Sequence, residues 1–184
     1  MKKRAFIIII FFFIFIVMVR YDMYYQYNNL TPQIQHGEFP FELKYEFNGQ
    51  IYEINDTVIC DFDGFDITGG FCKYRMWKES LKSENGRLTI ILDENVPSVL
   101  EPERINERSE LYFNYGEGEY YMDDCKSCNP AYVGPHFFYV ERYQKTPKVT
   151  YNDLTPLTED QLQKYFGIKI IDWKFSKPIK NIFL

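Results

Sequence analysis

Two kinds of hydrophobic pattern divide this chain: one unbroken apolar run near its start, and a series of short alternating segments after it. The run extends from Ala5 to Val19, with basic residues at positions 2–4 before it and Arg20 directly after it. A long apolar run with basic residues on its N-terminal side predicts a membrane segment whose basic end stays in the cytoplasm. The chain that follows the run is therefore expected to be exported.

The length and the flanks of this run favour a retained anchor over a cleaved signal peptide. Its fifteen residues would rise only about 22 Å as a helix, which is less than the ~30 Å hydrocarbon core and typical of a signal peptide. Cleavage, however, requires small residues, and residues 17–25 contain none. A helix continued through Tyr25 reaches about 31 Å, with Arg20 extending toward water and tyrosines at the headgroups. We therefore expect an uncleaved signal anchor that contacts the membrane through residues 5–25.

The alternating segments predict β-strands. Phe41, Leu43 and Tyr45 alternate with charged residues, as in a half-buried strand, and Asn48-Gly49 predicts a hairpin turn. Turn residues at 61–66, 85–86 and 116–119 separate further apolar segments. Strands are expected over 41–47, 50–54, 57–60, 71–78, 87–92, 111–115, 120–122, 136–142 and 168–175, and residues 94–110 are expected to form a loop or a short helix.

One helix is predicted near the C-terminal end. Thr158 and Gln161 fit a capping box, and Gly167 is a typical helix stop. The predicted fold is therefore mainly β (α+β): an antiparallel sheet, sandwich-like or barrel-like, with one short C-terminal helix. The expected organisation is a cytoplasmic basic tip and anchor over residues 1–25, a polar stalk over 26–37 and an extracytoplasmic β-rich domain over 38–184.

The charge of the exported part narrows the choice of partner. Without residues 1–20, 17 basic and 26 acidic residues remain, a formal net charge of −9. Nucleic acids and anionic lipids are bound by basic surfaces, so the acidic exported part is not expected to bind either of them as a ligand. The aromatic content of 19% favours strands over helices.

The lysine-led anchor is followed by the segments Phe41–Gly49, Val58–Phe65, Cys72–Lys78 and Leu157–Phe175. Together these segments resemble a set of uncharacterised membrane-anchored proteins of Gram-positive bacteria. The resemblance covers most of the exported part. It implies localisation at the cell membrane, and it implies no activity and no functional residues.

The four cysteines are Cys60, Cys72, Cys125 and Cys128. In an oxidising exterior they predict two disulfides, and we expect a Cys60–Cys72 bridge and a separate Cys125–Cys128 pair. A zinc site at all four cysteines is an alternative, although the spacing of Cys60 and Cys72 does not match a zinc knuckle. A thiol-disulfide oxidoreductase is a third interpretation, but the Cys-x-x-Cys segment precedes Asn129-Pro130 rather than opening a helix.

Two further groups of residues are candidates for binding. Asp61, Asp63 and Asp66 suggest a calcium loop, but their spacing fits a turn better than an EF-hand. Aromatic residues near the Gly-rich turns are expected to lie mostly in the core, although exposed tyrosines there would suit contact with a glycan or a protein. The candidate binding surface consists of Tyr115, Tyr120, Tyr121 and Tyr132.

The sequence does not contain the usual signatures of catalysis, such as Gly-x-Ser-x-Gly, His-Glu-x-x-His, a phosphate loop or a dinucleotide fingerprint. The expected function is therefore that of a non-enzymatic, membrane-anchored binding or envelope accessory module, with no cofactor and an envelope protein or glycan as partner. The alternative is an envelope thiol-redox or metal-binding protein that uses Cys125 and Cys128.

Overall fold

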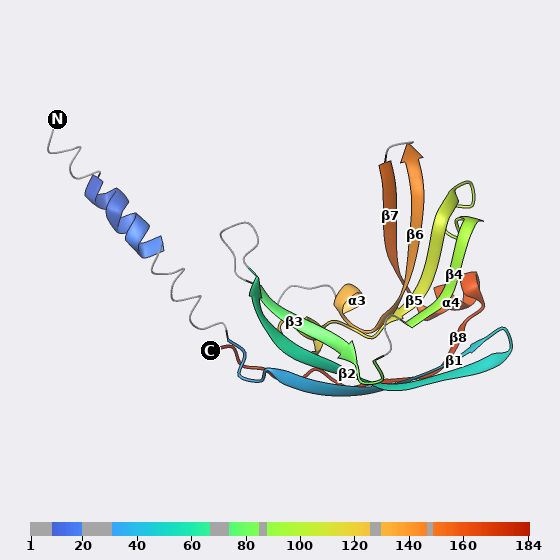
Figure 1. Ribbon diagram of the computed structural model, residues 1–184, viewed down its shortest axis with the longest axis horizontal. Coiled ribbons are helices and arrows are strands. Elements are labelled where there is room, and N and C mark those ends of the chain that lie inside the picture. The colour runs from blue at the N-terminus through green and yellow to red at the C-terminus, as the bar shows by residue number, and fades with distance from the viewer. Residues whose placement is uncertain (1–8, 20–30, 67–73, 85–87, 126–129, 147–148) are drawn as a thin grey trace.

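The structure is a computed structural model that describes residues 9–19, 31–66, 74–84, 88–125, 130–146 and 149–184 (Figure 1). Strands account for most of the ordered elements. They are β1 (His36–Phe47), β2 (Gln50–Asp66), β3 (Tyr74–Leu81), β4 (Leu88–Pro97), β5 (Ile105–Asn114), β6 (His136–Thr146), β7 (Val149–Leu157) and β8 (Lys169–Phe175). The helices are α2 (Gly118–Tyr121), α3 (Pro130–Val133) and α4 (Glu159–Phe166).

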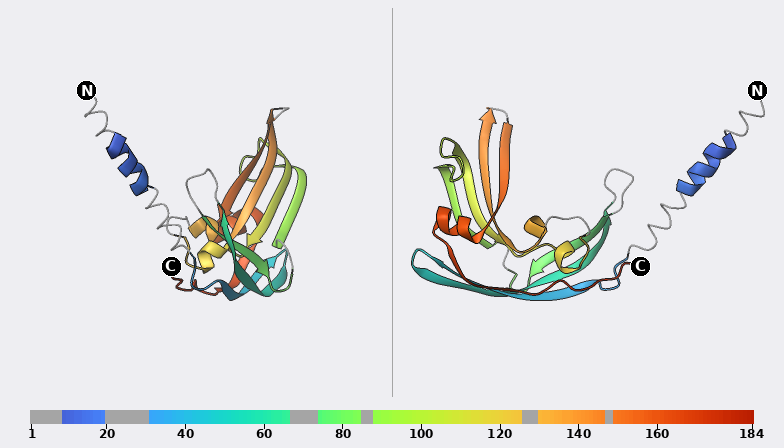
Figure 2. Two further views of the ribbon diagram at one scale, coloured as in Figure 1. Left: turned by 60° about the vertical axis from the view of Figure 1, so that its left-hand side comes forward. Right: turned by 180° about the vertical axis from the view of Figure 1, so that it is seen from behind.

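The strands form two antiparallel sheets of four, which confirms the mainly β prediction. The first sheet has the order β3-β2-β1-β8, and the second has the order β4-β5-β6-β7. In Figure 1 the long strands β1 and β2 run across the view, whereas β6 and β7 rise steeply from them. Figure 2 shows the same relation from two further sides.

The hairpin that joins β1 to β2 has the predicted turn. Phe47 pairs with Gln50, and both turn residues have positive φ, 52° at Asn48 and 74° at Gly49. A two-residue turn of this kind matches the twist of the flanking strands, which is why Asn-Gly favours it. The alternation then places Phe41, Leu43 and Tyr45 on the face that is buried.

Side chains from both sheets share one hydrophobic core. Aromatic rings dominate it, because Phe113 of β5 lies within 5.9 Å, centroid to centroid, of Phe41 in β1 and of Trp173 in β8. Such tilted and edge-to-face pairs add to the free energy gained by burying the rings. The high aromatic content therefore stabilises the contact between the two sheets.

Helix α4 confirms the predicted helix. The Thr158 side chain accepts a hydrogen bond from the Gln161 amide, the Gln161 side chain accepts one from the Thr158 amide, and Gly167 adopts the left-handed conformation at φ 67°. The helix buries Leu162 completely. The capping box at Thr158 and the glycine at position 167 thus define the two ends of this eight-residue helix.

The predicted hairpin around residues 116–119 is wrong, because Gly118 begins helix α2 instead. The Gly118 amide donates a hydrogen bond to Glu79 Oε1 at 2.6 Å. A Cβ atom on Gly118 would lie 2.8 Å from the same oxygen and would clash with Trp77 Cβ. The absence of a side chain therefore lets the backbone pack directly against β3, and this long-range contact overrides the local turn pattern.

Other boundaries also differ from the sequence prediction. Residues 94–110, expected as a loop or a short helix, contain the end of β4 and the first part of β5. In the turn between these strands, Ser98 Oγ accepts hydrogen bonds from the Leu100 and Glu101 amides. Strand β7 was not predicted, because it is polar and contains Pro156. It lies at a sheet edge, where proline is tolerated.

The Asp-Gly segment is part of a strand and not the predicted turn. β2 continues to Asp66, and its pairing with β3 shifts by one residue between Phe62 and Phe65. Gly64 has φ 89° within that shift, which is typical of a β-bulge. The aspartates at 61, 63 and 66 therefore lie along a bulged strand.

Residues 9–19 form a helix, and each of these apolar residues is between 41% and 69% exposed. Within the part of the chain that the structure describes, no helix combines the length and hydropathy needed to cross a bilayer. The anchor expected over residues 1–25 extends outside the described residues at both ends of this helix.

The end of the segment expected as a stalk is hydrogen-bonded to the domain. β1 already begins at His36, within the expected stalk. Before it, the Thr31 amide donates to the Leu184 carbonyl and the Leu184 amide donates to the Thr31 carbonyl, both at 3.1 Å. The Gln33 amide donates to the Ile182 carbonyl at 2.8 Å.

Candidate functional site

The structure contradicts the expected bridge at Cys60, which is a free thiol with 0% exposure. The prediction assumed a turn directly after Cys60, but β2 continues and places Cys60 opposite Glu79 of β3. Cys72 lies outside the described residues. Burial and the nearby carboxylate of Glu79 raise the pKa of the Cys60 thiol to about 12, so this cysteine is a core residue and a poor nucleophile.

Cys125 differs from Cys60, because it is disulfide-bonded. Cys128 lies outside the described residues. A bridged sulfur is not available as a thiolate ligand for zinc, and the described residues contain no group of three or more His, Cys, Asp or Glu side chains arranged to hold a metal ion.

The four tyrosines of the candidate binding surface do not form one exposed surface. Tyr121 is completely buried, stacks on Phe39 at 4.6 Å and donates its hydroxyl to the Tyr115 carbonyl at 2.5 Å. Tyr115 and Tyr120 are partly buried against the core, and Tyr132 is exposed. The prediction was therefore wrong for Tyr121, whose buried aromatic ring packs α2 against the core.

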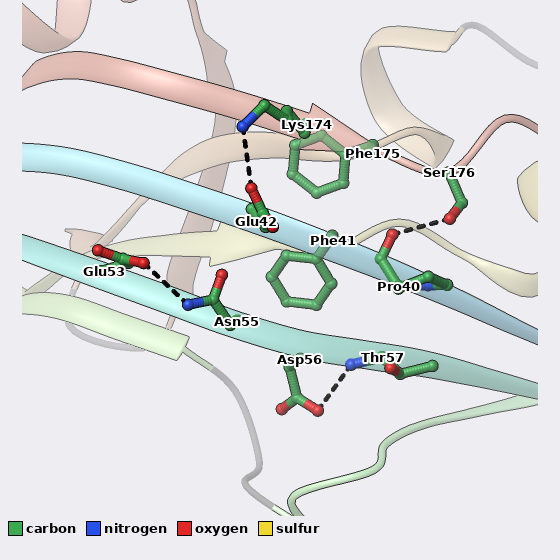
Figure 3. A pocket seen from close by; sticks show the side chains of 10 residues that line it. All are labelled: Pro40, Phe41, Glu42, Glu53, Asn55, Asp56, Thr57, Lys174, Phe175 and Ser176. Carbon is green, nitrogen blue, oxygen red and sulfur yellow. Dashed lines mark hydrogen bonds and ion pairs between the residues drawn. The ribbon is translucent and has the colours of Figure 1, made fainter.

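An open hollow lies on the first sheet, and we name it the basin. It has a volume of about 630 Å³ and lies across β2, β1 and β8 (Figure 3). Its lining residues are Pro40, Phe41, Glu42, Glu53, Asn55, Asp56, Thr57, Lys174, Phe175 and Ser176.

Strand register explains how the basin is built. Glu42 pairs with Asn55 on one side and with Lys174 on the other, so these three residues form one row across the strands. The next row consists of the shorter side chains of Pro40, Thr57 and Ser176. Pro40 pairs with Thr57, and the Ser176 amide donates a hydrogen bond to the Pro40 carbonyl. Because cross-strand neighbours share a face, small side chains beside long ones leave a hollow there.

The charged groups of the basin are held by ion pairs and hydrogen bonds. Lys174 Nζ lies 3.0 Å from Glu42 Oε2 and 2.6 Å from Asp172 Oδ2. Asn55 Nδ2 donates to Glu53 Oε1 at 3.0 Å, and Lys44 Nζ lies 3.5 Å from Glu53 Oε2. Figure 3 shows Lys174 extending from β8 toward Glu42, with Glu53 and Asn55 beside each other on β2.

These contacts favour the ionised forms of two groups in the basin. The hydrogen bond from Asn55 and the charge of Lys44 lower the pKa of Glu53, and the Asp172 and Glu42 carboxylates raise the pKa of Lys174. A carboxyl group that acts as a general acid has its pKa raised toward neutrality, which is the opposite of the change at Glu53. The basin presents carboxylate hydrogen-bond acceptors and the ammonium group of Lys174.

The basin was not predicted from the sequence. Alternation places Glu42 and Asn55 on the outward face of the first hairpin, and the Asn-Gly turn fixes their register. The pairing of β1 with β8 joins residues more than a hundred positions apart, and no local signal in the sequence indicates it.

A second polar cluster is buried in the second sheet. Arg104 forms an ion pair with Glu141, whose side chain is 2% exposed, and contacts Asp153 at 3.2 Å. Asn106 Nδ2 donates to Glu141 Oε1 at 2.8 Å, and the Arg104 guanidinium lies 3.9 Å from the centre of the Tyr143 ring. Arg104 Nε and Asn106 Oδ1 are buried in this cluster without a hydrogen-bond partner, whereas the other contacts join Arg104 of the β4–β5 turn to the sheet. We therefore assign the cluster a role in positioning the β4–β5 turn over the sheet.

Comparisons of the chain with protein-family models, with curated proteins and with solved structures found no match.

Proposed function

We propose that this protein is a membrane-anchored extracytoplasmic binding module, in which the apolar N-terminal segment holds a β domain at the membrane surface. The basin is the ligand surface of this module. It is the observation that carries the binding part of the proposal, because it combines an open hollow with charged and polar groups that face solvent and contact one another.

Three observations support the anchor and the compartment. The helix over residues 9–19 is apolar on all sides, and such a helix is stable only where protein or lipid covers it. A disulfide at Cys125 fits an oxidising exterior, since cytosolic thiols are kept reduced. The basic residues before the run favour the orientation in which the domain is exported.

The lining of the basin indicates the class of ligand. Carboxylate, amide and hydroxyl groups from Glu42, Asn55 and Thr57 offer several hydrogen bonds on a shallow surface. Hydroxyl-rich envelope glycans match this pattern, because each sugar hydroxyl can donate to a carboxylate and accept from an amide.

A binding measurement on the full chain in lipid nanodiscs tests the proposal. Soluble envelope polysaccharide fragments are the probes, and Asn55→Trp fills the basin from an exposed position on β2. Thr150→Trp, at an exposed position of β7, is the matched control. We expect Asn55→Trp to weaken binding at least tenfold and Thr150→Trp to leave it unchanged; equal binding by both variants would rule out the basin as the glycan site.

A further inference from the structure

The segment that leads into β1 and the segment 182–184 form a short antiparallel ladder. Thr31 and Leu184 exchange two backbone hydrogen bonds, and Pro32 bridges to Phe183. Asn181 extends the ladder, since its side chain accepts from the Ile34 amide at 3.0 Å and donates to the Ile34 carbonyl at 2.8 Å. Residues 182–184 are thereby held beside the point where the chain leaves the domain toward the apolar helix.

The ladder has one face toward the domain and one face away from it. Pro32 is buried, and the Arg75 guanidinium lies 4.1 Å from the centre of the Phe183 ring, so this pair faces the domain. Neighbouring residues of an extended chain point to opposite faces. Ile182 and Leu184 therefore share the outer face, where they are 56% and 61% exposed.

The sequence that leads to this face is basic. Between Phe175 and Leu184 the chain carries two lysines, Lys177 and Lys180, and no acidic side chain. Lys177 and Lys180 are exposed. Apolar side chains next to basic ones are typical of surfaces that contact a lipid headgroup region, where lysine interacts favourably with anionic lipid.

The connecting chain limits how far this face can lie from the membrane. Only residues 20–30 separate Thr31 from the apolar run that ends at Val19. Twelve fully extended steps span at most about 40 Å, and a helix continued through Tyr25 would shorten the reach to roughly half of that. With the apolar run in a bilayer, Thr31 and the ladder beside it would lie within about 40 Å of the membrane, so the outer face of the ladder is within reach of the bilayer.

We propose that Ile182 and Leu184 insert into the headgroup region of the same membrane that holds the apolar helix, with Lys177 and Lys180 at the surface. This inference rests on the proposed anchor. The domain then has a second contact with the bilayer and a fixed orientation toward it.

Quenching by brominated lipid tests the contact. The full chain is reconstituted in nanodiscs containing brominated phosphatidylcholine and phosphatidylglycerol, and Ile182→Trp is compared with Ile51→Trp. Ile51 is 62% exposed near the β1–β2 turn, at the other end of β1 from the ladder, which makes it a matched control. The signal is the emission that the added tryptophan contributes above that of the unsubstituted protein.

We expect the emission of Ile182→Trp to fall at least twofold in brominated relative to unbrominated nanodiscs, and that of Ile51→Trp to stay unchanged. Leu184→Trp should behave as Ile182→Trp does, which guards against a local effect of one substitution. Insertion of the chain into nanodiscs without quenching at either position would overturn the second contact and leave the anchor intact. A chain that does not co-elute with nanodiscs would overturn the anchor and the second contact together.

Discussion

Cys60 shows how the surroundings of one residue decide its chemistry. Its thiol is completely buried, and a pKa of about 12 leaves about one thiolate in ten thousand molecules at pH 8. We expect Cys60 to resist an aromatic disulfide reagent in the folded protein and to react within minutes once guanidinium unfolds the chain. Rapid reaction of Cys60 under native conditions, located by mass spectrometry, would contradict its place in the core.

Cys125 leads to a different prediction, because it is bridged. We propose Cys128 as its partner, as the short spacing of Cys125-Lys126-Ser127-Cys128 suggests. Mass mapping of non-reduced peptides should recover a peptide linked between Cys125 and Cys128. A peptide that links Cys125 to Cys72 would show instead that the bridge joins distant segments.

The buried ion pair between Arg104 and Glu141 predicts a large effect of a single substitution. Arg104→Ala leaves the Glu141 carboxylate buried without its cation, and removing one partner of such a pair costs about 3–5 kcal/mol of unfolding free energy. Arg142→Ala is the control, because the pair of Arg142 with Glu107 at 3.4 Å is exposed on both sides (55% and 37%) and should contribute less than about 1 kcal/mol. Urea unfolding of the two variants measures the difference, and equal losses would show that the Arg104 cluster is not a buried network.

At the scale of the element, helix α4 depends on its capping box. Thr158→Ala removes the acceptor for the Gln161 amide and should lower the free energy of unfolding by about 1 kcal/mol. Thr150→Ala, on an exposed part of β7, should change it by less than about 0.5 kcal/mol. Chemical denaturation checks both values, and a neutral Thr158→Ala would mean that packing of Leu162 alone holds the helix.

Elements with a local chemical signal were predictable from the sequence. The β1–β2 hairpin follows from alternation and Asn48-Gly49, and α4 follows from its cap and from Gly167. Strand β8 was also expected nearly at its observed bounds, because its apolar residues follow directly after the helix stop.

The elements that were missed are those that long-range contacts determine. Gly118 forms a helix because its backbone packs on Trp77, and no neighbour in the sequence signals that contact. The Asp-Gly segment resembles a turn locally, but pairing with β3 makes it a bulged strand. The basin has the same origin, since β8 reaches it from the other end of the chain and brings Lys174 to Glu42.

In the whole molecule, the two sheets have different roles. The first sheet carries the basin on its outward face, and the ladder at Thr31 and Leu184 adjoins the start of its strand β1. The second sheet completes the core through rings such as Phe113 and Phe137. The proposed ligand surface and the proposed membrane contact therefore both belong to the first sheet.

We propose above all that the apolar run stays in the membrane and holds the domain outside the cytoplasm. Protease accessibility tests this topology, with the full chain carrying an epitope on the cytoplasmic side. The protease is added to intact cells, or to spheroplasts where an outer barrier must first be removed. We expect the protein to sediment with membranes and the protease to remove everything beyond about Tyr25, leaving a short membrane-bound fragment. A soluble mature form that begins near residue 20, or a domain that the protease reaches only after lysis, would contradict this topology.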